Sequence, residues 1–114
     1  MAWKGPARVD GRPWPVASDS VVWLPPGTHS IEPAPAHPPL RILDFTGDLE
    51  AADSPEGGGA RLWYQSASRA IAVVERRPLR VEVDGVAIAI NVLPSGGYWA
   101  LILPRGKHMV KIQD

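Results

Sequence analysis

Residues 80–92 read RVEVDGVAIAINV, and this stretch decides how the rest of the chain is interpreted. Two runs of β-branched and other apolar residues, 81–83 and 86–92, flank Asp84-Gly85. Asp-Gly between such runs is the strongest short-range signal for a β-hairpin, because both residues of the tight turn need a positive φ. The stretch therefore predicts two antiparallel strands joined by a two-residue turn.

The residues that follow continue the same pattern to the C-terminal end of the chain. A turn is expected at 94–97 (PSGG), a third strand at 98–103, a second turn at Pro104-Arg105-Gly106 and a fourth strand at 107–112. The C-terminal third is thus predicted to be a four-stranded antiparallel meander.

The N-terminal third repeats this order of motifs. Val9-Asp10-Gly11 matches Val83-Asp84-Gly85, and 22–31 (VWLPPGTHSI) matches 101–110 (LILPRGKHMV). The shared pattern is VDG, a spacer, then LPxGxHx followed by Val or Ile. It predicts an internal duplication of a four-strand unit at 8–33 and 81–112, or two units that converged on the same turn chemistry.

Between these units lie three short segments rich in strand formers, at 40–45, 60–65 and 69–75. Residues 66–68 are expected to join the last two as a hairpin, 32–39 to be an extended Pro-rich connector between sheets, and 47–59 to be a surface loop with at most one irregular strand. No helical periodicity is present. We therefore expect one domain over 1–114, an all-β antiparallel β-sandwich of immunoglobulin-like or jelly-roll type with nine to eleven short strands.

The composition excludes several classes of protein. The 114 residues carry 12 Lys+Arg and 12 Asp+Glu, so the basic surface that nucleic acid requires is not expected. No Cys is present, which excludes disulfides and thiolate-bound zinc. The apolar stretches are far shorter than the roughly 20 residues of a membrane helix. Because the N-terminus carries no export signal, the chain is expected to be either cytosolic or part of a longer exported protein.

Tryptophan is the compositional anomaly that points to function, with five residues in 114. Alternation in 60–65 puts Leu62 and Tyr64 on one side of a strand and Arg61, Trp63 and Gln65 on the other. An indole among hydrogen-bonding side chains suits sugar recognition, because the C–H face of a pyranose stacks on the ring while polar groups reach its hydroxyls. The alternative is that this face packs beneath a loop.

The other aromatic residues divide by their surroundings. Trp14, between Pro13 and Pro15, is expected at an edge or in a loop and is a second stacking candidate. Trp23 is a third candidate, although the core is the favoured place for it. Tyr98 is a further candidate that fits either environment.

Histidine and acidic side chains supply weaker candidates. His29 and His108 occupy equivalent repeat positions, and each ring is expected to lie against the sheet end and bond to the preceding turn, not to hold a metal. His37 has no evident partner. Calcium could be bound by the acidic cluster Asp44, Asp48, Glu50, Asp53 and Glu56, although a solvated loop is the default. No cofactor is expected.

The phrases LWYQS (62–66), RAIAV (69–73), RVEVDG (80–85) and LPRGKHMV (103–110) resemble the β-sandwich accessory modules of bacterial glycoside hydrolases. The VDG and LPxGxHxV pattern is also similar to PEGA-type repeats. The resemblance covers 60–112 well and 8–33 loosely. It is a pattern of turns and strands and assigns no functional residue.

Together these observations predict a non-catalytic carbohydrate-binding module. It would bind a plant-type polysaccharide, a β-glucan or xylan, and keep a covalently linked hydrolase near its substrate outside the cell. The alternative is a structural spacer or protein-interaction domain that binds no glycan, and an enzyme is the least expected reading because no acid–base pair with a partner is evident.

Overall fold

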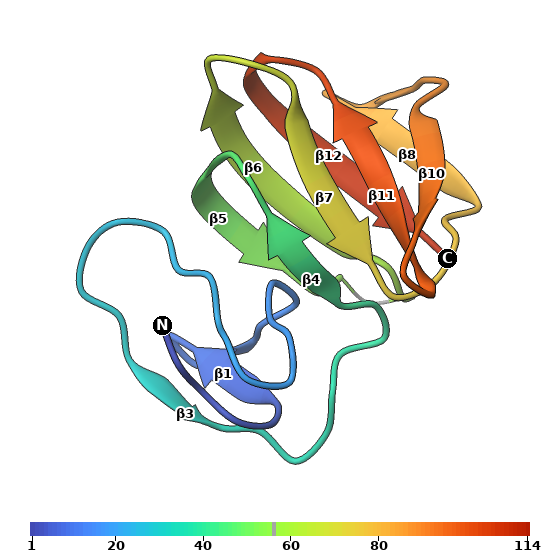
Figure 1. Ribbon diagram of the computed structural model, residues 1–114. Helices are drawn as coiled ribbons and strands as arrows, with labels where there is room; N and C mark the ends of the chain where they lie inside the picture. The colour runs from blue at the N-terminus through green and yellow to red at the C-terminus, as the bar shows by residue number, and fades with distance from the viewer. Residues whose placement is uncertain (56) are drawn as a thin grey trace.

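The computed structural model describes residues 1–55 and 57–114, and this part of the chain is all-β (Figure 1). Its twelve strands form three antiparallel sheets, ordered β2-β1-β3, β10-β11-β7-β4 and β5-β6-β12-β8-β9. The strands are β1 Ala7–Val9, β2 Arg12–Pro13, β3 Ile31–Pro33, β4 Ile42–Phe45, β5 Asp48–Asp53, β6 Ala60–Ser66, β7 Ala70–Val74, β8 Arg80–Val83, β9 Val86–Ala87, β10 Asn91–Ser95, β11 Tyr98–Leu103 and β12 Gly106–Gln113. The predicted all-β, sandwich-type architecture is confirmed.

The four-stranded and five-stranded sheets form two layers with the core between them. Alternation places one face of each strand inside, as in β6, where Leu62 and Tyr64 are fully buried while Trp63 and Gln65 point outward. From the other layer, Leu101 and Leu103 of β11 are likewise fully buried. The inward residues of both sheets and the N-terminal sheet form one contiguous apolar cluster.

Two connections cross between the layers at the same end of the sandwich (Figure 1). β6 belongs to the five-stranded sheet and β7 to the four-stranded sheet, so residues 67–69 join two layers. The predicted hairpin at 66–68 is therefore wrong. Likewise, β11 and β12 lie in different sheets, so a continuous four-stranded C-terminal meander is not formed. The pairs β8–β9 and β10–β11 are hairpins, and the chain crosses between the layers after each of them. Local turn residues could not reveal this, because neither β7 nor β12 pairs with the strand that directly precedes it in sequence.

The strand predicted over 86–92 also divides between the two layers. The Asp84-Gly85 hairpin forms as expected, with Val83 opposite Val86. The chain then leaves the sheet after Ala87 and enters the other layer as β10. The turn predicted at 94–97 is shorter than expected, because Ser95 already pairs with Tyr98 and only Gly96 and Gly97 form the turn. Pro94 is tolerated within β10 because β10 is an edge strand.

The described residues of the acidic segment 47–59 contain one strand, β5, which is bulged between Leu49 and Ala51. This agrees with the expectation of at most one irregular strand. The Pro-rich connector after β3 leads from the N-terminal sheet to β4, also as expected. Glu56 lies outside the described residues.

The two predicted repeat units share their strand pairing. In the first unit β1 lies between β2 and β3, and in the second β8 lies between β9 and β12. Val9 is opposite Ile31, two residues after His29, and Val83 is opposite Val110, two residues after His108. Three strands of each unit thus correspond in order and register.

The same polar contacts close both units. Asp10 and Asp84 adopt φ values of 52° and 53° at the first position of their Asp-Gly turns, as a type I′ turn requires. Asp10 Oδ2 lies 2.7 Å from His29 Nδ1 and its Oδ1 accepts the Ser30 amide at 2.9 Å. Asp84 makes the corresponding contacts with His108 at 2.7 Å and the Met109 amide at 3.0 Å. We call each aspartate and histidine pair an Asp–His clasp.

Each clasp also fastens the turn before its histidine. His29 Nε2 lies 3.0 Å from the carbonyl oxygen of Pro25, and His108 Nε2 lies 2.8 Å from that of Arg105. The prediction that both rings bond to the preceding turn is confirmed. Because both nitrogens of each ring face acceptors, the protonated imidazolium is the form that satisfies them all. The hydrogen bonds to Asp10 and Asp84 raise the pKa of His29 and of His108 above their ordinary value.

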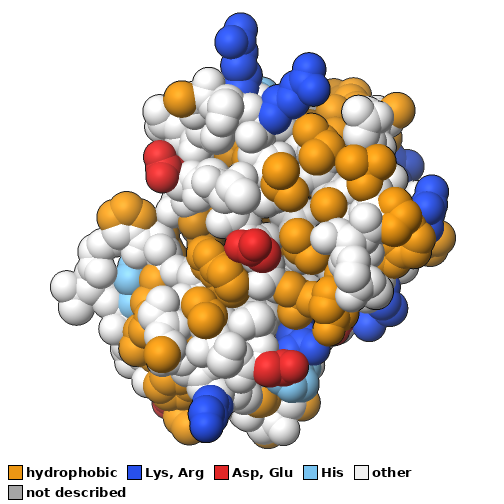
Figure 2. All heavy atoms as spheres, viewed as in Figure 1, with side chains coloured by type: hydrophobic (Ala, Val, Ile, Leu, Met, Phe, Trp, Pro, Cys, Tyr) orange, Lys and Arg blue, Asp and Glu red, His pale blue; other side chains and the backbone are white. Residues whose placement is uncertain are grey.

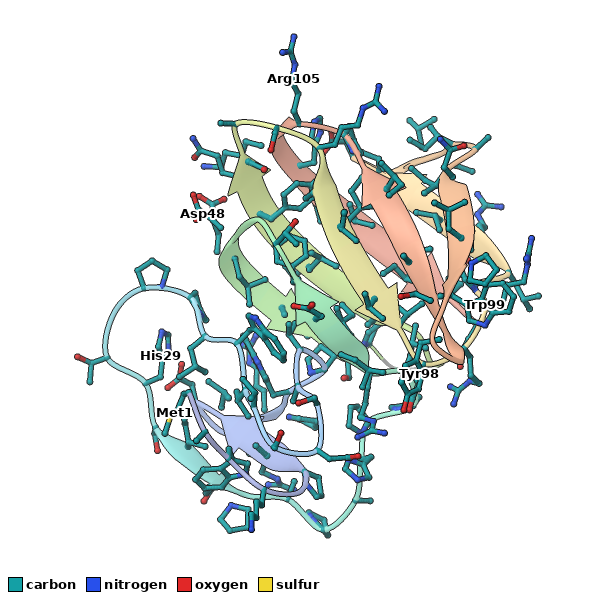
Figure 3. All side chains as sticks on the ribbon, in the orientation of Figure 1. Met1, His29, Asp48, Tyr98, Trp99 and Arg105 are labelled. Carbon is teal, nitrogen blue, oxygen red and sulfur yellow. The ribbon has the colours of Figure 1, made fainter. Side chains whose placement is uncertain are left out.

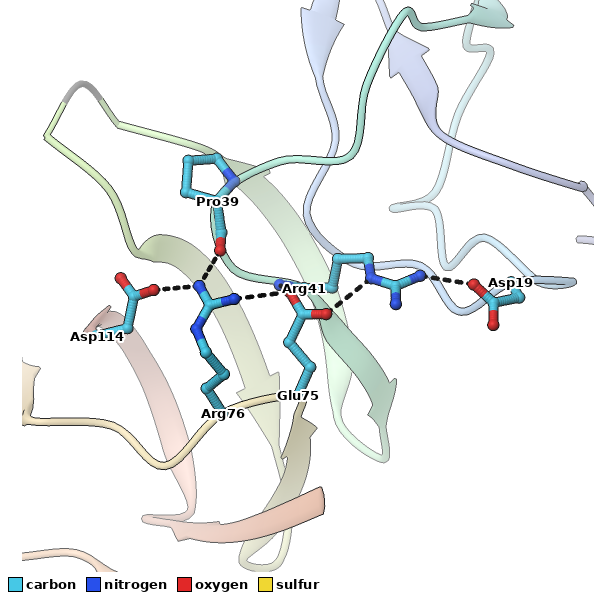
Figure 4. A network of polar contacts seen from close by, with 6 residues as sticks. All are labelled: Asp19, Pro39, Arg41, Glu75, Arg76 and Asp114. Atoms are coloured by element: carbon cyan, nitrogen blue, oxygen red, sulfur yellow. Dashed lines mark hydrogen bonds and ion pairs between the residues drawn. The ribbon is translucent and has the colours of Figure 1, made fainter. Parts of the chain in front are cut away.

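A chain of ion pairs joins the N-terminal unit to the sandwich (Figure 4). Arg41, just before β4, donates to Asp19 at 2.7 Å and to Glu75 at 3.1 Å. Arg76 continues the chain from Glu75 to Asp114 and also donates to the Pro39 carbonyl oxygen. Since Asp19 precedes the segment that carries Trp23, this network helps to fix the position of that segment.

Candidate functional site

The outer face of the five-stranded sheet carries three of the predicted site residues. Arg61, Trp63 and Gln65 point outward from β6, as alternation predicted. Trp63 is half-buried, and the Arg61 guanidinium lies over its ring at 5.4 Å from the centroid. Asp53 of β5 accepts from Arg61 at both carboxylate oxygens, with the Nε contact at 2.8 Å. The two hydrogen bonds that Arg61 donates to Asp53 therefore fix the guanidinium beside the indole.

The neighbouring strands set what surrounds Trp63 on this face. Across the sheet, Trp63 lies between Ala51 of β5 and Met109 of β12. Gln65, one step further along β6 on the same face, lies between Asp48 and Lys107. The small Ala51 side chain leaves space beside the indole. Trp63 is consequently the only aromatic residue in its row of the sheet, bordered by apolar neighbours on two sides.

A hollow of about 580 Å³ lies between the N-terminal unit and the start of β5. Trp23 of the N-terminal unit and Gln65 of β6 both line it, so the structure brings a fourth predicted site residue, Trp23, next to Gln65. The remaining lining residues are Leu24, Pro26, Gly47, Asp48, Leu49 and Glu50. We call this hollow the Trp23 groove. Gln65 connects it to the outer face that carries Trp63.

Local sequence explains the shape of the groove. A Cβ at Gly47 would come within 2.9 Å of Phe45 Cζ, so a larger residue at the turn into β5 would displace the buried Phe45 ring. Asp48 and Glu50 then point outward because Leu49 between them is buried. On the opposite wall, His29 Nε2 lies 3.2 Å from the carbonyl oxygen of Pro26. The first Asp–His clasp thus holds the turn that forms this wall.

The sequence marks Asp48 and Glu50 as members of an acidic cluster and gives no indication of the groove that they line. Figure 3 shows Asp48 at the outer edge of the sandwich and His29 on the loop of the N-terminal unit, on the same side of the molecule. Alternation over 48–53 could have indicated that both carboxylates point outward. Their proximity to Trp23 could not be read from the sequence, because it depends on how the N-terminal unit docks.

Two predicted site residues lie elsewhere. Trp14 is only 6% exposed, and its Nε1 donates to the Trp23 carbonyl oxygen at 2.9 Å. The expectation of an exposed stacking ring at Trp14 is therefore wrong; the segment after β2 turns its indole into the core, where it supports Trp23. Tyr98 is exposed, but it lies beside Trp99 on the side of the molecule away from Asp48 (Figure 3).

The acidic residues of 44–53 do not converge. Asp44 lies on β4, while Asp53 is engaged by Arg61 on β5. Within residues 1–55 and 57–114, no group of three or more His, Asp or Glu side chains is arranged to hold a metal ion. His37 is exposed on the Pro-rich connector.

The outer face of β6 and the Trp23 groove together offer indole rings for stacking, an amide and carboxylate acceptors. This set of groups suits binding of a hydroxyl-rich ligand.

In the described part of the chain, no helix has the length and apolar character needed to cross a membrane. Comparison of the whole sequence and structure with protein-family models, with curated proteins and with solved structures finds no match to this chain.

Proposed function

We propose that this chain is a non-catalytic β-sandwich module that binds a plant-type polysaccharide, a β-glucan or xylan, and thereby holds a linked glycoside hydrolase near its substrate. The observation that carries the proposal is the continuity of Trp23, Gln65 and Trp63 along one surface. A chain-like ligand needs more than one contact point, and this surface offers two indoles with an amide between them.

The physical basis of binding would be stacking with hydrogen bonding. An indole buries the apolar face of a sugar ring, while the Gln65 amide both donates and accepts. The ion pair with Asp53 keeps Arg61 in place and lowers the entropy lost when a ligand is bound. Linkage to a hydrolase would raise the effective concentration of enzyme at the polysaccharide.

Affinity electrophoresis in gels that contain mixed-linkage β-glucan or soluble xylan tests the proposal. The wild-type chain should be retarded, Trp63→Ala should lose most of the retardation, and Tyr98→Ala should keep it. Tyr98 is the matched control because it is an exposed aromatic residue outside the proposed surface. Near-ultraviolet circular dichroism and the melting temperature show whether each variant is folded. Failure of every glycan to retard the wild type would refute the proposal.

A specific observation favours the alternative of a spacer or protein-interaction domain. The outer face of the four-stranded sheet is largely apolar, with Ile71, Leu93 and Ile102 on neighbouring strands (Figure 2). Ile71 and Leu93 are 38% and 53% exposed. Such a face is typical of a protein contact. This alternative predicts no glycan retardation and loss of partner binding in Leu93→Lys.

A further inference from the structure

The charge of the Trp23 groove restricts which ligands it can accept. Among its described lining residues, Asp48 and Glu50 are the ionisable ones, and both carry carboxylates. Gln65 is the remaining polar side chain of the lining. Carboxylates accept hydrogen bonds and donate none at neutral pH. A ligand in this groove must therefore supply hydrogen-bond donors to the carboxylates of Asp48 and Glu50.

One positive charge, that of Lys107, lies near the carboxylates of the groove. Lys107 Nζ lies 3.8 Å from Glu50 Oε1, and the Lys107 side chain is 74% exposed. An ion pair of this kind contributes little, because water and salt screen it. Within the described residues no ion pair engages Asp48. The groove consequently has a net negative charge in the absence of ligand.

We propose that the Trp23 groove accepts uncharged sugar chains and rejects anionic ones, and that Asp48 and Glu50 set this specificity. This inference rests on the proposed function and names the ligand class of the same site. Hydroxyl groups of a neutral sugar would donate to the two carboxylates while the ring packs against Trp23. A uronate or sulfate group would bring an acceptor and a like charge to the same place.

A basic peptide segment is the other ligand that carboxylates beside an indole could attract. The groove lining favours a sugar, because Leu24 and Pro26 provide an apolar wall and Gln65 adds an uncharged amide. The Lys107 contact also reduces the attraction of Glu50 for a second cation. Basic peptide binding is nevertheless one of the outcomes that the test separates.

The test uses two polymers with the same backbone, hydroxyethyl cellulose and carboxymethyl cellulose, with matched chain lengths. Isothermal titration at an ionic strength of about 0.02 M should give about three- to tenfold weaker binding of the anionic polymer. At about 0.5 M salt the difference should largely disappear, because the Debye length is then only a few ångströms. Asp48→Asn with Glu50→Gln should remove the preference at low salt.

Glu32→Gln with Asp44→Asn is the matched control. It changes the net charge by the same amount at two exposed positions outside the groove, so the preference should persist. Equal binding of both polymers by the wild type at low salt would overturn this inference while leaving the proposed function intact. Tighter, salt-sensitive binding of oligolysine than of either polymer would also overturn it. Failure of the wild type to bind either cellulose derivative, mixed-linkage β-glucan or xylan would refute the proposed function itself.

Discussion

Tyr64 should stabilise the fold at neutral pH and lose this effect in alkali. Its side chain is fully buried at the centre of the sandwich, and its hydroxyl donates to the Pro104 carbonyl oxygen at 2.6 Å. The ring also packs edge-on against Phe45, with centroids 5.4 Å apart. Pro104 lies where the chain crosses from β11 to β12, so this hydrogen bond joins β6 to the crossing. Tyr64→Phe removes the bond and keeps the ring.

At pH 7 the variant should lose about 1 to 2 kcal/mol of unfolding free energy, because a carbonyl oxygen in the interior loses its donor. This corresponds to a melting temperature lower by about 4 to 10 °C for a domain of this size. Urea denaturation followed by tryptophan fluorescence measures the difference directly.

The pH dependence provides a second and sharper criterion. Burial, with a smaller effect from Asp84, raises the pKa of Tyr64 to about 12. The unfolded chain ionises its tyrosines near pH 10, so the stability due to this group is complete below about pH 10 and is lost as the pH rises towards 12. At pH 11 the wild type should have lost about 1.4 kcal/mol that the phenylalanine variant cannot lose.

The gap between wild type and Tyr64→Phe should therefore close or nearly close at pH 11, while all other titrating groups cancel in the comparison. A gap that stays constant from pH 7 to 11 would refute the reasoning that the interior holds the phenol neutral. Equal stability of the two proteins at pH 7 would refute the role of the hydrogen bond to Pro104.

Three further predictions concern the clasps, the sheet edge and the ion-pair network. Because the pKa values of His29 and His108 are raised in the folded state, the stabilisation that these residues provide is complete below about pH 6.5. This stabilisation declines as the pH rises through the folded-state pKa values. The melting temperature of the wild type should therefore fall from pH 6 to 9, and it should fall less when both histidines are replaced by Asn. Pro94→Thr should restore an amide donor to the free edge of β10 and increase self-association, which light scattering at rising concentration measures, whereas an unchanged monomer would contradict this. Arg41→Met should loosen the N-terminal unit by removing its contact with Asp19 and make the chain cleave faster in limited proteolysis, and a cleavage rate equal to that of the wild type would count against the network.

The local features of the fold were predictable because they depend on residues close together in sequence. Asp84-Gly85 requires two positive φ values and forms the expected hairpin. Alternation in β6 correctly placed Leu62 and Tyr64 on one side of the strand, and this side is the buried one. The histidine contacts were also predictable, because each ring reaches a carbonyl oxygen only three or four residues before it.

The pairing of strands between layers was not predictable from the same signals. Ser66-Ala67-Ser68 has the composition of a hairpin turn, yet β6 pairs with β5 and β12 while β7 pairs with β11 and β4. A short polar link serves a hairpin and a crossing equally well. The choice depends on which strands can bury their apolar faces together, and that is a property of the whole chain.

The candidate site shows the same division. The side of β6 on which Trp63 lies follows from alternation, whereas the position of Trp23 depends on how the N-terminal unit docks against β5. Pro13 and Pro15 around Trp14 indicated a stiff segment, but a stiff segment can hold an indole inside as well as outside. In this fold the Trp14 hydrogen bond to the Trp23 carbonyl oxygen requires the inside position.

Prolines occupy three of the strands that lie at sheet edges, β2, β3 and β10. In antiparallel pairs every second residue directs its amide away from its partner. The pairs Val9 with Arg12, Glu32 with Arg8, and Ser95 with Tyr98 place Pro13, Pro33 and Pro94 at positions directed away from the neighbouring strand.

β2, β3 and β10 are all edge strands, so at these positions a free edge lacks the donor that an added strand would need. The second repeat unit offers an internal comparison. Ile112 of β12 occupies the position of Pro33, and there β12 pairs with β6. Ile112 has a backbone amide at the position where β12 pairs with a further strand, whereas the equivalent position on the free edge of β3 is Pro33. Strand addition is therefore disfavoured at the edges formed by β2, β3 and β10.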